Sequence, residues 1–146
     1  MPKGQGQKRK LLVLQKTLLE RTDEDHPLTV KELIDELERW DIQAERKSIY
    51  DDLEQLRQFG LDVQSRKGKT PGWYIGERTF ELPELKLLVD AVQSSKFITR
   101  RKSDSLISKL ESLASVHQAR QLQRQVYVSG RVKTMNESIY YNVDKI

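Results

Sequence analysis

The sequence predicts a mainly helical chain with one β-hairpin, and three observations support this. Apolar residues recur at helical spacing before residue 60, alternate with polar residues between about residues 61 and 75, and return to helical spacing from about residue 80. The chain has 146 residues, of which 33% are charged and 36% hydrophobic, which suits small helical units with much exposed surface. We therefore expect small packed units instead of one large core.

Two helices are expected before residue 41. A Gly- and Gln-rich start at residues 1–7 is expected to be disordered, and a first helix follows over residues 8–21, with a buried stripe of Leu11, Leu14 and Leu18. Thr29 and Glu32 have the spacing of a capping box, which predicts that a second helix begins at Val30. The side chains expected to be buried on that helix are Leu33, Ile34, Leu37 and Trp40.

A third helix is expected from about Glu45 to Phe59, because Ile49, Leu53 and Leu56 form one stripe and Gly60 suits the helix end. The spacing then becomes alternating around the Gly- and Pro-rich turn at residues 67–72, which predicts a hairpin. Its tip is basic, with Arg66, Lys67 and Lys69. Three helices followed by such a hairpin predict a winged helix-turn-helix over residues 1–78.

A helical arm or bundle is expected over residues 79–125. Pro83 suits the first turn of a helix over residues 80–95, Thr99 caps a second helix, and a third covers about residues 116–125. Their apolar stripes need cover, either from each other or from a second copy, so we expect a homodimer formed through this arm. Residues 126–146 continue with a short strand and the start of another helix, and we expect the chain to be a fragment of a longer protein.

Catalytic and metal-binding patterns are sparse, so we expect no enzyme, no metal and no cofactor. The chain has no cysteine, and His26 and His117 are far apart without metal-ligand spacing. The neighbouring acids Asp51 and Asp52 point in different directions on a helix and make a poor acid and base pair. No apolar run approaches the roughly 20 residues of a membrane span, so we expect a soluble cytoplasmic protein.

The charge distribution points to nucleic acid. The net charge is only +4, but no acid lies between Met1 and Leu19, where Lys8, Arg9 and Lys10 form a basic start. On the third helix a rotation of about 100° per residue turns Lys47, Asp51 and Glu54 away from the buried stripe. The side chains offered outward by its first half are Arg46, Lys47, Ser48 and Tyr50.

That end of such a helix enters the major groove of double-stranded DNA. We expect Arg46 to contact guanine, Lys47 to contact guanine or phosphate, and Ser48 and Tyr50 to contact phosphates or a base edge. The hairpin tip and the basic start can follow the phosphate backbone or the minor groove, and Thr29 can help to hold a phosphate at a helix start, although capping explains it as well. The alternatives are solvated basic faces and a protein-interaction module without DNA.

The sequence from Arg46 to Gly60 resembles the third-helix signature of bacterial winged-helix regulators that carry a WYL domain, and residues 80–92 and 131–136 resemble the same family. The resemblance implies a transcription regulator with a C-terminal sensory domain, of which residues 126–146 would be only the start, and whose effector stays unknown. Trp73, Tyr74 and Ile75 imitate the triplet that names the family, but they fall in the hairpin, where packing is their expected role. Many relatives have Ser and Arg where this chain has Glu45 and Asp51, and an acid at position 51 is expected to repel phosphates.

Overall fold

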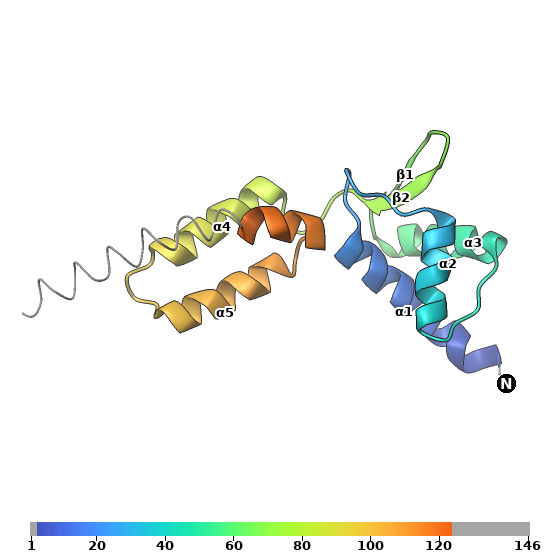
Figure 1. Cartoon of the computed structure of the whole chain (residues 1–146), viewed down its shortest axis with the longest axis horizontal. Coiled ribbons are helices and arrows are strands. Elements are labelled where there is room, and N and C mark those ends of the chain that lie inside the picture. Colours follow the sequence, from blue (N-terminus) through green and yellow to red (C-terminus); the bar gives the residue numbers. More distant parts are fainter. Residues whose placement is uncertain (1–2, 124–146) are drawn as a thin grey trace, which may run out of the picture. The chain divides into compact units, whose positions relative to one another are not determined.

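A computed structural model describes residues 3–123 of the chain. Its contacts divide the chain into two compact units, Met1–Arg78 and Thr79–Ile146 (Figure 1). The described residues are mainly helical with one two-stranded antiparallel hairpin, as the sequence predicts, and this arrangement is compatible with a winged helix. The strand and the helix expected within residues 126–146 lie outside the described residues.

The first helix, α1, covers Lys3–Arg21 and therefore begins five residues earlier than expected. The expectation of disorder is therefore wrong for residues 3–7. A formed helix gains one backbone hydrogen bond for each residue that is added, so two glycines need not stop its growth toward the amino terminus. Leu14 and Leu18 are buried as predicted, whereas Leu11 is exposed and Val13 is buried in its place.

The second helix, α2, covers Val30–Arg39 and begins at the predicted capping box. The Thr29 hydroxyl accepts from the Glu32 amide at 3.1 Å, and the Glu32 carboxylate accepts from the Thr29 amide at 3.1 Å. Leu33 and Leu37 are buried, but the prediction for Trp40 is wrong, because this side chain is 41% exposed. The helix ends before Trp40, Asp41 takes a left-handed conformation with φ 57°, and the buried side chain of the following turn is that of Ile42.

The third helix, α3, covers Arg46–Phe59, and the predicted stripe of Ile49, Leu53 and Leu56 is buried. Gly60 ends the helix as predicted, with a positive φ of 129°, a conformation that side-chain-bearing residues rarely adopt. Its amide donates to the carbonyl oxygens of Leu56 and Arg57, which have no partner within the helix.

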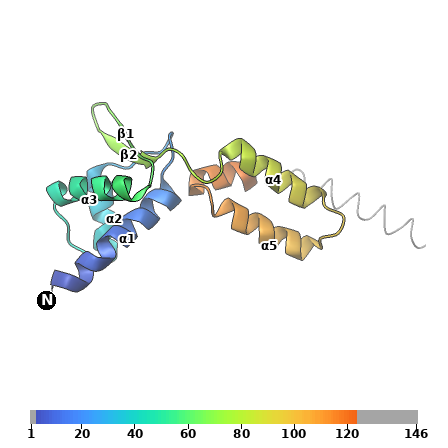
Figure 2. The same ribbon diagram turned by 180° about the vertical axis from the view of Figure 1, so that it is seen from behind.

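The hairpin pairs β1 (Val63–Arg66) with β2 (Gly72–Ile75), with Val63 opposite Ile75 and Arg66 opposite Gly72. Its loop projects away from the three helices in both views (Figures 1 and 2). A feature that the sequence did not indicate is an isolated bridge between Leu28 and Trp73, whose amides donate to each other's carbonyl oxygens at 2.9 and 2.8 Å. This bridge ties the segment before α2 to β2.

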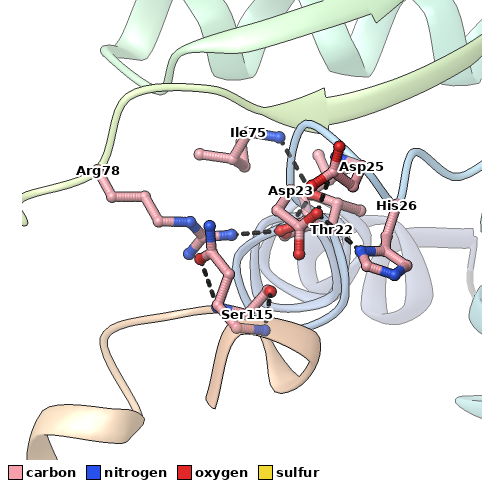
Figure 3. Close-up of polar contacts among 9 residues, drawn as sticks. Thr22, Asp23, Asp25, His26, Ile75, Arg78 and Ser115 are labelled. Atoms are coloured by element: carbon pink, nitrogen blue, oxygen red, sulfur yellow. Dashed lines mark hydrogen bonds and ion pairs between the residues drawn. The ribbon is translucent and has the colours of Figure 1, made fainter. Parts of the chain in front are cut away.

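All five elements of Met1–Arg78 contribute to one apolar core. At its edge lies Thr22, whose hydroxyl donates to the Leu18 carbonyl oxygen at 2.6 Å and accepts from the Ile75 amide at 3.0 Å (Figure 3). The Arg78 guanidinium donates to the Thr22 carbonyl oxygen. Burial lowers the pKa of Arg78, and the nearby Asp23 carboxylate opposes this shift. Thr22 therefore joins the end of α1 to β2 and to the end of the unit.

The unit Thr79–Ile146 contains α4 (Leu82–Ser94), α5 (Arg100–Glu111) and a helical segment over residues 116–123. Both helix starts agree with the sequence. Pro83 lies in the first turn of α4, and the Thr99 hydroxyl accepts from the Lys102 amide at 3.2 Å at the start of α5. α4 and α5 lie side by side (Figures 1 and 2). The buried side chains that hold this unit together include Leu85, Ala114 and Leu122.

We expect Thr22→Val to lower the free energy of unfolding by about 1–3 kcal/mol, because the buried Ile75 amide loses its acceptor. Thr17→Val is the matched control. Thr17 is also buried in α1, but its hydroxyl only donates to the Val13 carbonyl oxygen, so its removal orphans no amide and costs less. Urea unfolding of both variants measures the difference, and equal losses would show that Thr22 does not stabilise the hairpin in this way.

Candidate nucleic-acid interface

The outward face of α3 follows from its buried stripe. Ile49, Leu53 and Leu56 pack into the core, so a rotation of about 100° per residue turns Lys47, Asp51 and Glu54 away from it. All three of these side chains are exposed. The two flanks of the helix contact different elements, and these contacts fix how α3 is presented.

One flank of α3 is bound to α1 through Lys10. The Lys10 ammonium lies 2.7 Å from the Asp52 carboxylate and donates to the Ser48 hydroxyl at 2.8 Å, while Ser48 donates to the Glu45 carbonyl oxygen at 2.8 Å. Lys10 is only 4% exposed. This corrects the expectation that Lys10 is presented to a phosphate backbone, because its charge is already engaged inside the unit. Ser48, half-buried, is likewise engaged.

The other flank of α3 contacts the hairpin. The ring of Tyr50 meets the ring of Trp73 edge to face, with centroids 5.4 Å apart and planes at 70°. The Arg46 Nε lies 3.5 Å from the Tyr50 hydroxyl. Two helical turns beyond Tyr50, Arg57 donates twice to the Val63 carbonyl oxygen, at 3.1 and 3.0 Å. The side of α3 that carries Arg46 and Tyr50 therefore adjoins the hairpin.

The base of the hairpin is closed by Asp62. Its carboxylate accepts from the Glu77 amide at 2.6 Å and from the Gln64 side-chain amide at 2.6 Å, and these two hydrogen bonds lower the pKa of Asp62. Gly76 lies against the same carboxylate, and a Cβ at this position would come within 2.5 Å of it. Asp62 thus holds together the two chain segments from which the hairpin extends.

The remaining predicted residues differ in their surroundings. Arg46, Lys47 and Tyr50 are exposed on α3, Arg66, Lys67 and Lys69 are exposed at the hairpin tip, and Lys8 and Arg9 are exposed on α1. Thr29 lies at the start of α2, where its hydroxyl serves the capping box. We call Arg46, Lys47, Arg66, Lys67 and Lys69 the basic face.

The expected packing role of Trp73 is confirmed, because its side chain packs against the core, but the sequence did not indicate that Arg57 and Trp73 join α3 to the hairpin. Both contacts cross between elements, Arg57 to β1 and Tyr50 to Trp73 on β2. The spacing of residues along one helix carries no information about such contacts, and the aromatic character of Tyr50 and Trp73 was the only available signal.

Among residues 3–123 no group of three or more His, Asp or Glu side chains is placed to hold a metal ion. His26 contacts the Asp23 carboxylate at 2.8 Å. In the same part of the chain, no helix combines the length and the apolar character needed to cross a membrane.

Comparison with protein-family models, with curated proteins and with solved structures found no match to the chain. Function is therefore inferred from the residues themselves, above all from those that surround α3.

We expect Lys10→Met to lower the free energy of unfolding by about 3 kcal/mol, because the largely buried Asp52 carboxylate loses its cation. Lys8→Met is the matched control, since Lys8 is an exposed lysine of the same helix and its loss should change stability by no more than about 0.5 kcal/mol. Denaturant unfolding distinguishes the two. Similar stabilities of Lys10→Met and Lys8→Met would show that the Asp52 carboxylate does not depend on Lys10 as its partner.

Proposed function

We propose that the unit Met1–Arg78 binds double-stranded DNA sequence-specifically as a winged helix-turn-helix, with α3 in the major groove and the hairpin on the adjacent backbone or minor groove. The observation that carries this proposal is the contact of Tyr50 with Trp73. It joins the exposed basic start of α3 to a hairpin whose exposed tip is also basic. A helix and a hairpin connected in this way can contact a groove and its neighbouring phosphates at once.

The balance of charge supports the same proposal. Two of the three acids of α3 are paired, Asp52 with Lys10 and Glu54 with Arg57 at 2.8 Å. The five cations of the basic face therefore stand against one unpaired acid of that helix, Asp51, within the described residues. Phosphates are attracted by such an excess, and binding by counterion release follows from it.

The residues have distinct roles in the proposed complex. The planar Arg46 guanidinium suits the paired acceptors of guanine, Lys47 suits guanine or phosphate, and Tyr50 suits a phosphate. Ser48 faces Lys10 and contributes less than the sequence suggests. At the start of α2 only backbone amides remain for a phosphate, because the Thr29 hydroxyl is used in capping.

The resemblance of residues 46–60 to WYL-domain regulators supports assignment to bacterial transcription regulation. A sensory domain would then follow the described residues and would respond to an effector. We propose transcription regulation as the role of the protein. This role requires DNA binding, which can be tested directly.

We expect the full chain to bind duplex DNA with an affinity that falls by orders of magnitude between about 50 and about 200 mM salt. Arg46→Ala should cost about 1–3 kcal/mol at a sequence selected from random duplexes and relax the preference at one base position. Lys67→Ala should weaken binding to all duplexes equally. It should also reduce the slope of log K against log salt by about 1. Fluorescence anisotropy titrations measure both.

Lys96→Ala removes a comparable exposed cation from the other unit and serves as the control. It should leave both the affinity and the salt dependence unchanged. Binding that is indifferent to salt, or that responds to Lys96→Ala as strongly as to Lys67→Ala, would contradict the proposal and favour a protein-interaction module.

We also propose that the chain forms a homodimer through the unit Thr79–Ile146. Two copies of α3 could then contact one duplex. An open groove of about 500 Å³ lies between α4 and α5, with apolar side chains that include Leu88, Val92 and Leu106. Leu113 also lines this groove and is 40% exposed, while Leu87 and Phe97 are among the most exposed apolar side chains. Apolar surface of this kind is stabilised when a second copy covers it.

Sedimentation tests this dimer. We expect the full chain to sediment as a dimer at micromolar concentration and Leu113→Asp to sediment as a monomer, because a charge in the covered groove is costly. Leu12→Asp is the control, since Leu12 is an exposed leucine of α1 and lies outside the proposed contact. A wild-type monomer at high micromolar concentration, with and without DNA, would refute the dimer without affecting the assignment of the basic face.

A further inference from the structure

We infer that Asp51 determines specificity by selecting a cytosine in the major groove. This inference rests on the proposed DNA binding and adds the identity of one base that α3 prefers. An acid on a DNA-binding surface is otherwise expected only to repel phosphates.

The position of Asp51 places it at the centre of the outward face of α3. It follows the buried Ile49 by two residues, a rotation of about 200° around the helix. Lys47 precedes it by one turn on the same face, and both side chains are exposed. Asp51 therefore lies at the part of the helix that is nearest to the base edges when α3 enters a groove.

The chemical state of Asp51 differs from that of the other acids of α3. Asp52 is held by Lys10 at 2.7 Å, and Glu54 is held by Arg57 at 2.8 Å. In the described part of the chain, Asp51 forms no ion pair or hydrogen bond, although Lys47 is one turn away. Its two carboxylate oxygens are therefore available to an external donor.

A carboxylate accepts hydrogen bonds and cannot donate them while it is ionised. The major groove offers donors at the amino groups of cytosine and adenine, whereas guanine and thymine present acceptors that repel a carboxylate. Adenine also carries an acceptor, N7, beside its amino group, so cytosine is the better partner. Because the same charge repels phosphates, Asp51 favours discrimination between sequences over total affinity.

The test uses the full chain, a pool of duplexes with a randomised centre, and Asp51→Asn. This change keeps the side-chain shape, removes the charge and adds an amide donor. We expect wild type to select cytosine at one position, with a preference on the order of tenfold, and Asp51→Asn to lose it there while it keeps the other selected positions. We also expect Asp51→Asn to bind an unrelated duplex a few-fold more tightly, because one repulsive charge is gone.

Asp35→Asn is the matched control, since it removes an exposed aspartate of α2 from the same unit. It should leave the base preferences as in wild type. A cytosine preference that survives in Asp51→Asn, or that is lost equally in Asp35→Asn, would overturn the inference while DNA binding itself stands. Failure of wild type to bind any duplex would instead remove the proposed function, and this inference with it.

Discussion

The fixed rotation of α3 about its own axis is the constraint on which the rest of Met1–Arg78 depends. Ile49, Leu53 and Leu56 bury one stripe of the helix, and this stripe alone decides which residues face outward. The two flanks then restrict what remains free. Ser48 and Asp52 meet Lys10 of α1, and Tyr50 and Arg57 meet the hairpin. A helix held on three sides offers only one face to a partner.

The two flanking attachments differ in their energetics. A buried ammonium loses its hydration, and its attraction to a carboxylate returns little more than that loss, so the pair of Lys10 and Asp52 is expected to add less net stability than apolar packing would. Removal of one partner is nevertheless costly, because the other charge then stays buried alone. The hairpin flank combines an aromatic contact with hydrogen bonds to a single carbonyl oxygen, that of Val63. These contacts fix the position of α3 more than they add to the stability of the unit.

The sequence predicted the local features well because each depends on neighbouring residues. The capping box of Thr29, the buried stripe of α3 and the helix end at Gly60 all follow from short-range spacing, and all are confirmed. The failures have two causes, a partner that is distant in the sequence and a helix end that the spacing does not show. Lys10 was expected to follow a phosphate backbone because nothing near it predicts Asp52, which lies 42 positions later, and Trp40 was expected in the core because the spacing continues past the true end of α2. Of the candidate site, the sequence predicted which cations α3 and the hairpin carry, but not the contacts that join the two elements.

The contacts that join α3 to the hairpin are important because the two elements have different roles in the proposed complex. Contacts to phosphates supply affinity without sequence information, whereas contacts to base edges supply discrimination. In the proposed complex the exposed lysines at the hairpin tip make contacts of the first kind, and Arg46 makes a contact of the second kind. Discrimination requires that α3 keep one register while the hairpin is anchored, because a helix that rocks against its anchor meets several base pairs with similar energies. The ring contact of Tyr50 with Trp73, the bonds from Arg57 to Val63 and the closed base at Asp62 all restrict that rocking.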